Sequence, residues 1–210
     1  MKLFSFLKKS KKVAKPTDIK KANEKPHSGK KPKEQQLVKI WKPRPTLVER
    51  SFPNDEIIVS KTDTRGNITY GNKIFIKMSG YSPEELMGQP HSIVRHPDMP
   101  QIIFKALWDT VSKGKEINAY VINLAKDGSY YWVYANVTPS FDVKRNIIGY
   151  HSVRRRPNKK AIEIIEPFYK VLRKAENIGG IHESTKELVK LLDSKKMEYE
   201  ELIYHLQYML

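Results

Sequence analysis

The stretch from Asn72 to Pro100 reads NKIFIKMSGYSPEELMGQPHSIVRHPDMP. Short apolar segments alternate in it with polar, glycine and proline residues. The segment SPEELMG begins with a cap at Ser82, has proline at the first helical position and glutamate three residues after the cap, and ends at Gly88. These features predict a very short helix. The preceding NKIFIKMSG predicts one helical turn ended by Gly80. The stretch therefore predicts two short helices followed by a polar segment.

That polar segment, HSIVRHPDMP, gathers hydrogen-bonding side chains between apolar neighbours. Arg95 offers a planar fork of donors that suits a phosphate. His91 and His96 can donate or accept hydrogen bonds near neutral pH. Asp98 is suited either to cap the following helix or to hold Arg95 or a histidine in place. The combination suits an organic ligand with phosphates, and a purely structural turn is the alternative.

Strand patterns lie on both sides of this stretch. The predicted strands are EIIVSKTD, the segment after the turn at 65–67, INAYVINLA, YYWVYANVTPSF and NIIGYHSVR. An amphipathic helix is predicted before Gly114, and KDGS predicts a hairpin turn between two of the strands. Two strands, several helices and a three-strand meander predict an α+β domain, in which helices cover one face of an antiparallel sheet. Such packing leaves a natural pocket between helices and sheet.

The sheet side of that pocket is expected to supply amides. Asn123 and Asn136 lie in apolar strands, where a buried amide needs hydrogen-bond partners. An amide both donates and accepts, which suits the polar edge of a flat ring such as isoalloxazine. The alternative is that these polar side chains satisfy one another and the neighbouring backbone.

Charge is concentrated at the N-terminus. Residues 1–46 contain 15 lysines and arginines against 3 acidic residues, so they carry +12 of the total net charge of +16. With five prolines and few apolar residues, they are predicted to form a basic disordered arm. The arm is either a solvated tail or a contact for an anionic surface, such as a membrane or an acidic partner. Stacking aromatics are scarce, so no nucleic-acid partner is predicted.

Residues 158–210 have helical periodicity after the sheet domain of residues 54–157. Ile162, Ile165, Phe168 and Leu172 follow a spacing of three and four. Pro167 is expected to kink or split this helix, and Gly179-Gly180 interrupts the pattern before it resumes. The stripe predicts a helical hairpin or a dimerising helix, and hence a possible homodimer.

Several functional classes find no support. The chain has no cysteine, which excludes disulfides, thiol nucleophiles and cysteine-ligated metals. Motifs of hydrolases, nucleotide-binding loops and zinc proteases are absent, so no enzyme is predicted. His91, His96 and Asp98 could in principle ligate a metal, but Pro97 opposes one continuous helix and no metal site is predicted. No apolar run reaches the length of a spanning helix. The lack of cysteine fits a reducing cytoplasm, which is the expected location, with membrane association through the basic arm as an extension of it.

Four segments resemble the PAS domain of bacterial aerotaxis and energy-taxis sensors. They are NKIFIKMSGYSPEELMGQPHSIVRHPDMP, FKALWDTVSKG, NLAKDGSYYWVYANVTP and GYHSVRRRP, within residues 54–157. The resemblance implies a five-stranded antiparallel sheet with short helices and FAD bound non-covalently. The positions that match flavin-associated residues of the family are Asn72, His91, Arg95, His96, Asp98 and Asn136.

One position departs from that family. Ile117 stands three residues after Gly114, where members commonly have tryptophan. The resemblance otherwise implies a redox or energy-taxis sensor that signals to a separate chemoreceptor-type partner. The alternative is a ligand-free PAS scaffold that only pairs proteins.

Overall fold

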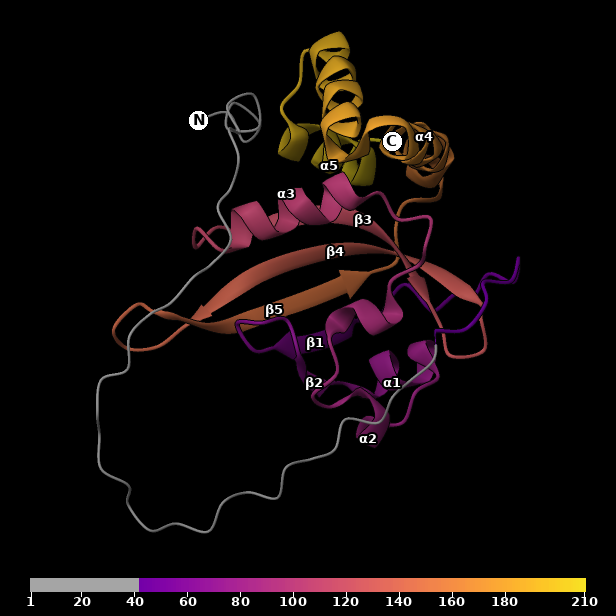
Figure 1. Cartoon of the computed structure of the whole chain (residues 1–210). Coiled ribbons are helices and arrows are strands. Elements are labelled where there is room, and N and C mark those ends of the chain that lie inside the picture. Colours follow the sequence, from indigo (N-terminus) through magenta and orange to yellow (C-terminus); the bar gives the residue numbers. More distant parts are fainter. Residues whose placement is uncertain (1–41) are drawn as a thin grey trace, which may run out of the picture.

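The computed structural model describes residues 42–210, and it contains one five-stranded antiparallel sheet (Figure 1). The strand order is β2-β1-β5-β4-β3. The strands are β1 (Ile58–Thr62), β2 (Ile68–Gly71), β3 (Ile117–Leu124), β4 (Tyr130–Phe141) and β5 (Ile147–Arg155). The predicted α+β class and the five-stranded antiparallel sheet are therefore confirmed.

Short helices connect β2 to β3. They are α1 (Lys73–Ser79), α2 (Pro83–Leu86), the 3-10 helix η2 (His91–Val94) and the longer α3 (Gln101–Val111). The predicted cap of α2 is present, because the Ser82 hydroxyl accepts from the backbone N–H of Glu85 while the Glu85 carboxylate accepts from that of Ser82. In Figure 1, α1 and α2 lie beside β1 and β2, and α4 (Lys159–Lys195) and α5 (Tyr199–Tyr208) gather beside β3.

The C-terminal helices cover the second face of the sheet. The Tyr169 hydroxyl of α4 donates a 2.7 Å hydrogen bond to the Tyr120 carbonyl of β3. The ring of Tyr208 meets that of Tyr134 edge-on, with centroids 5.9 Å apart. Strand β3 is consequently buried on nearly its whole length. The helical stripe predicted over 158–210 thus packs on the sheet of its own chain, and helices lie on both faces rather than on one.

The break in α4 differs from the expected one. Pro167 keeps helical dihedrals, and the only non-helical residues within α4 are Gly179 (φ −144°) and Gly180 (φ 68°). The expectation that Pro167 splits the helix is wrong. Because Pro167 and Glu163 lie on the exposed side of α4, the carbonyl that loses its intrahelical donor faces water.

Residues 44–52, named the N-terminal strap, pack against the turn between β3 and β4. The Thr46 N–H donates to the Gly128 carbonyl at 2.7 Å, and the Arg50 N–H donates to the Tyr130 carbonyl at 2.7 Å. Gly128 has a φ of +87°, and a Cβ atom there would collide with the Arg44 carbonyl, so glycine is required for the strap to lie this close. Residues 1–41, most of the predicted basic arm, lie outside the described residues.

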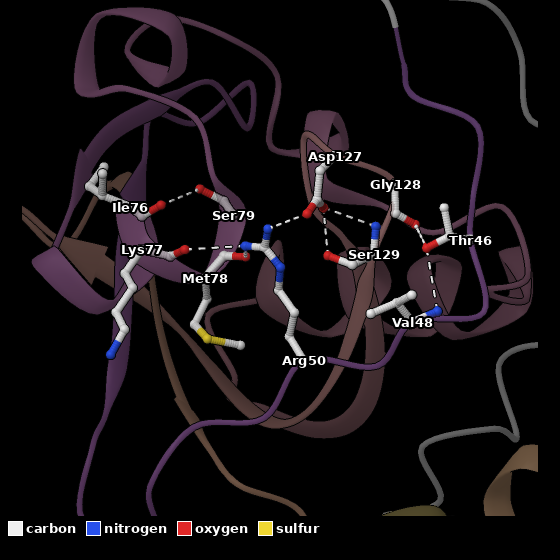
Figure 2. A network of polar contacts seen from close by, with 10 residues as sticks. All are labelled: Thr46, Val48, Arg50, Ile76, Lys77, Met78, Ser79, Asp127, Gly128 and Ser129. Carbon is white, nitrogen blue, oxygen red and sulfur yellow. Dashed lines mark hydrogen bonds and ion pairs between the residues drawn. The ribbon is translucent and has the colours of Figure 1, made fainter.

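The side chain of Arg50 ties the strap to α1 and to the same turn (Figure 2). Its guanidinium donates to the carbonyls of Lys77 and Met78 at 3.3 and 3.0 Å, and to the Asp127 carboxylate at 2.6 Å. A cation at the C-terminal end of a helix is stabilised by the free carbonyls and by the helix dipole. Arg50 therefore joins three segments that are distant in the sequence.

Substituting Arg50 with alanine is expected to lower the free energy of unfolding by about 1.5 kcal/mol, because hydrogen bonds from a charged group to two helix-end carbonyls are lost. Urea unfolding of the full chain measures the change. The matched control is Arg65→Ala, since the Arg65 side chain is 84% exposed and forms an ion pair only at the surface, with Asp63 at 3.5 Å. Equal costs for the two substitutions would contradict the role given to Arg50.

Candidate functional site

A cavity of about 330 Å³ lies between α3 and one face of the sheet. Phe104, Leu107 and Trp108 of α3 form one wall. Val121 of β3 and Ala135 of β4 contribute to the floor. The polar residues that line it include Ser60, His91, Arg95, Asn123, Ser152 and Arg154. Among the described residues, no carboxylate lines this cavity.

Strand alternation places the polar residues of the floor. Tyr150, Ser152 and Arg154 of β5 are two residues apart, so their side chains point to the same face of the sheet. Antiparallel pairing sets β5 between β1 and β4, with Ser60 opposite Ser152. Arg154 therefore reaches the cavity from the central strand of the sheet.

Arg154 is the centre of a buried polar cluster. Only 4% of the residue is exposed, and its Nη2 donates to the Ser60 hydroxyl at 2.8 Å and to Nε2 of His91 at 2.7 Å. The guanidinium also lies over the Phe75 ring, 5.4 Å from its centroid. Burial lowers the pKa of Arg154 to about 10, so the side chain is charged at neutral pH.

His91 is the neutral member of this cluster. Arg154 can only donate, so Nε2 of His91 must accept, which places the imidazole proton on Nδ1. Burial, and then the charge of Arg154, lower the pKa of His91 to about 3. The imidazole stacks on Phe75 with ring centroids 5.8 Å apart. The cluster thus has one positive charge and no counter-charge.

Hydrogen-bonding capacity in the cavity wall is left unused. Nη1 of Arg154, Nε of Arg95 and the hydroxyl of Ser152 are buried and have no hydrogen-bond partner within the described part of the chain. The Arg95 guanidinium lies 3.6 Å from the centroid of Phe104, and burial lowers its pKa. Unpaired buried donors are costly, and guanidinium groups suit flat, acceptor-rich or anionic groups. The wall thus presents unused donors of the kind from which such groups accept hydrogen bonds.

Two of the six predicted site residues line the cavity, namely His91 and Arg95. His96 and Asp98 do not. Nδ1 of His96 accepts from the Asp98 N–H at 3.2 Å, and its own backbone N–H donates to the Ile122 carbonyl at 3.3 Å. Burial lowers the pKa of His96, whereas the Asp98 carboxylate, 3.7 Å away, opposes this shift. These contacts attach the segment after Arg95 to β3.

Asn72 also lies outside the cavity lining. Its side-chain oxygen accepts from the N–H groups of Phe75 at 3.0 Å and Val59 at 3.1 Å, and its amide nitrogen donates to the Ile57 carbonyl at 2.7 Å. Asn72 is therefore the N-cap of α1 and joins this helix to β1.

The expected position of Asn136 in the pocket is corrected by the structure. Ala135 and Val137, its neighbours in β4, line the cavity, so the side chain of Asn136 points to the opposite face. There its amide donates to Asn118 at 3.1 Å. Asn123, which was considered alongside it, is 3% exposed and does line the cavity.

The sequence prediction missed Arg154 and Ser60. Arg154 begins the run RRR, which suggests a solvated charged segment. The available signal was the alternation along β5, where Arg154 shares a face with Tyr150 and Ser152. Within the cavity lining, Tyr150 also meets Trp108 edge-on with ring centroids 5.3 Å apart.

Comparison with known families addresses the fold directly. The family described as "PAS fold" matches residues 68–154, which run from the start of β2 to the last but one residue of β5. The sheet order, the short helices and the cavity between them belong to this matched region. The sheet-containing part of this chain therefore has the PAS fold.

Relatives of this PAS domain are signalling proteins. The aerotaxis receptor of Escherichia coli strain K12 is 39% identical over 140 residues, which are 66% of this chain and 28% of that protein. A nitrogen fixation regulatory protein of Klebsiella pneumoniae is 30% identical over 52% of this chain and 21% of its own. A solved light-oxygen-voltage domain, described with a flavin analogue, aligns at 18% identity with a TM-score of 0.47, over 53% of this chain and 83% of that one. The chain spans less than a third of the length of either curated relative.

The neutral state of His91 makes the stability of the PAS domain dependent on pH. Because the pKa of His91 is about 3 in the folded state and about 6.5 in the unfolded state, only the unfolded chain binds this proton between those values. We expect the free energy of unfolding to be fully retained above pH 6.5 and to fall as pH decreases below it, by up to about 1.4 kcal/mol per pH unit from this group.

Urea unfolding of the full chain between pH 7.5 and 5 measures this dependence. His96 and His151 also have pKa values lowered by burial, so His91→Gln should reduce the slope by the share of one proton rather than abolish it. His182, whose side chain is 77% exposed, supplies the control variant His182→Gln. A slope unchanged in His91→Gln would show that His91 is protonated in the folded state.

Proposed function

We propose that this PAS domain binds FAD non-covalently and serves as a redox sensor for taxis, which passes its signal to a separate chemoreceptor-type partner. The observation that supports it most is the buried cationic wall, in which Arg154 and Arg95 keep unpaired N–H groups and no carboxylate faces them within the described lining. The similarity to the aerotaxis receptor supports the taxis role.

The residues present fit a flavin. Nη1 of Arg154 and the amide of Asn123 would serve the carbonyl oxygens and nitrogens at the polar edge of the ring. Phe104, Leu107 and Val121 would cover its apolar part. Arg95 would serve a phosphate, since its fork of donors matches phosphate oxygens. When bound, the isoalloxazine ring supplies reversible uptake of electrons and protons.

The chain's own groups determine the electrostatics of that site. Arg154 holds one positive charge that neutral His91 and Ser60 orient but do not compensate. The wall should therefore favour ligands, and charge states of a ligand, that place negative charge against β5. Ile117, where the family commonly has tryptophan, is 1% exposed, pairs with Val137, and lies outside the cavity lining.

The remaining parts of the proposal concern the chain's setting. We infer that the protein is no enzyme and works in the cytoplasm, with a second copy of itself or the membrane surface as further contacts of its helices and basic arm. No helix within residues 42–210 has the length and apolar character that crossing a bilayer demands. The signal would leave through β5 and the helices that follow it.

The proposal is tested with purified protein of residues 1–210. Its visible absorption spectrum should show the bands of oxidised flavin, and heat-released cofactor should be FAD rather than FMN. Protein that is isolated without colour should take up added FAD with quenching of flavin fluorescence, and bind riboflavin more weakly because the phosphate contacts are missing. A colourless protein that takes up neither FAD nor riboflavin would contradict the proposal and favour the ligand-free scaffold.

A further inference from the structure

Helix α3, which forms one wall of the cavity, has no cap of its own. Its N-cap position is Pro100, which has no side-chain cap hydrogen bond, and the exposed Asp98 does not supply one. The backbone N–H of Ile102 donates instead to Oε1 of Glu176 at 2.9 Å. Glu176 lies in α4, 74 residues further along the chain. The C-terminal extension thus completes a helix of the PAS domain.

The side chain of Glu176 is buried and does not lie at the surface. Only 1% of its side chain is exposed, and its Oε2 accepts from Nη1 of Arg173 at 3.1 Å. A carboxylate at the start of a helix accepts from otherwise unpaired N–H groups and is stabilised by the helix dipole. Because a buried charge is tolerated only while its partners are in place, the Glu176 contact depends on the position of the first turn of α3.

Two neighbouring features suggest that this contact connects the cavity with the break in α4. On one side, Phe104 and Leu107 of α3 line the cavity, so an occupant touches the same helix whose first turn Glu176 holds. On the other side, α4 leaves helical geometry at Gly179 and Gly180, three residues beyond Glu176. Both glycines are exposed, and nothing lies within 4 Å of a Cβ atom built on Gly180. Gly180 is therefore unobstructed, whereas a Cβ atom on Gly179 would collide with the side chain of Glu183.

We propose that Glu176 is the contact through which occupation of the cavity controls opening of α4 at Gly179-Gly180. An occupant that packs on Phe104 holds α3 in place, and this strengthens the Ile102–Glu176 hydrogen bond. The part of α4 before Gly179 then stays packed against α3, and the helix does not open at the glycine pair. The identity of the occupant as FAD rests on the proposed function, whereas the link itself rests on the contacts above. Coupling of this kind is reciprocal, so opening of the glycine pair must weaken binding by the same factor by which binding protects the pair from opening.

Hydrogen exchange of the full chain, followed by mass spectrometry, tests the link first without added ligand. Glu176→Ala should speed exchange of peptides covering 101–106 and 176–184 by about 5-fold, a factor within the usual range of such couplings. Glu176→Gln retains one acceptor oxygen and should lie between Glu176→Ala and the parent. Glu163→Ala, at an exposed glutamate of the same helix, is the control and should change neither peptide. Unchanged exchange at 101–106 in Glu176→Ala would overturn the link.

The second arm adds FAD. In the parent protein, FAD should slow exchange of 176–184 by about 5-fold, and in Glu176→Ala it should bind about 5-fold more weakly and leave that peptide unaffected. A persistent response at 176–184 in Glu176→Ala would overturn the proposal. If the parent protein binds no FAD, both the proposed function and the claim that an occupant controls α4 are overturned. The experiment without ligand still decides whether Glu176 joins α3 to α4.

Discussion

Replacing Arg154 with methionine is expected to weaken FAD binding by about 100-fold while making the ligand-free protein more stable. The loss of affinity follows from removing a buried guanidinium whose Nη1 has no protein partner within the described structure. Hydrogen bonds from charged donors contribute about 1.5–3 kcal/mol each, and 100-fold corresponds to about 2.7 kcal/mol. Methionine has a similar length and fills the apolar space beside Phe75 without a charge.

The opposite sign for stability has a separate cause. In the absence of a ligand, Arg154 is a buried charge without a counter-charge, and replacing such groups by apolar ones is often stabilising by about 1–4 kcal/mol. Its two partners do not become isolated, since the Ser60 hydroxyl and Nε2 of His91 lie 3.0 Å apart and can pair with each other. We therefore expect unfolding of the ligand-free Arg154→Met protein to require about 1 kcal/mol more than that of the parent.

Fluorescence titration with FAD and urea unfolding together measure the two effects. Arg155→Met is the matched control, because Arg155 is the next residue of β5, is exposed, and lies outside the cavity lining. It should change affinity by less than about 2-fold, as surface substitutions away from a site usually do. Unchanged affinity in Arg154→Met, or a ligand-free protein less stable than the parent, would mean that Arg154 serves the fold and not a ligand.

The parts of the fold that local chemistry determines could be predicted from the sequence. The capping box at Ser82 and the KDGS turn depend on neighbours within four residues, and both are present. The packing of α4 and α5 on the sheet depends on tertiary contacts, which the local sequence does not determine. Their apolar stripe fits a hairpin, a dimer seam or a second sheet face equally well, because periodicity shows that one side is buried and not what buries it.

The same limit explains the errors at the site. His91 and Arg95 were identified because they stand in an unusual polar segment, whereas Arg154 was hidden in a run of three arginines. Asn136 was assigned to the pocket because a polar residue interrupts an apolar strand, but β4 is buried on much of both faces, so hydropathy could not indicate which one it occupies. The cap on α3 from Glu176 spans 74 residues and leaves no local signal.

Neighbouring residues of β4 allow the assignment of faces to be tested directly. Ala135 lines the cavity and is 2% exposed, whereas Asn136 points away and donates to Asn118 at 3.1 Å. Replacing Ala135 with leucine would place three additional carbon atoms in the space that a flavin ring needs. Because interiors of this density do not yield without strain, we expect FAD affinity to fall by at least about 100-fold. The ligand-free protein should keep its stability, since the added atoms enter an existing cavity.

Asn136→Ala should leave FAD affinity within about 2-fold of the parent, because its amide contacts the face that the C-terminal helices cover. Fluorescence titration of both variants measures their FAD affinities, and circular dichroism confirms that they fold. Because the two residues are adjacent in β4, the comparison shows which face of the strand the ligand contacts. If Asn136→Ala loses FAD while Ala135→Leu retains it, the occupied side of the sheet is the one beneath α5. The cavity would then have no ligand, and the wall of unpaired donors around Arg154 would need another explanation.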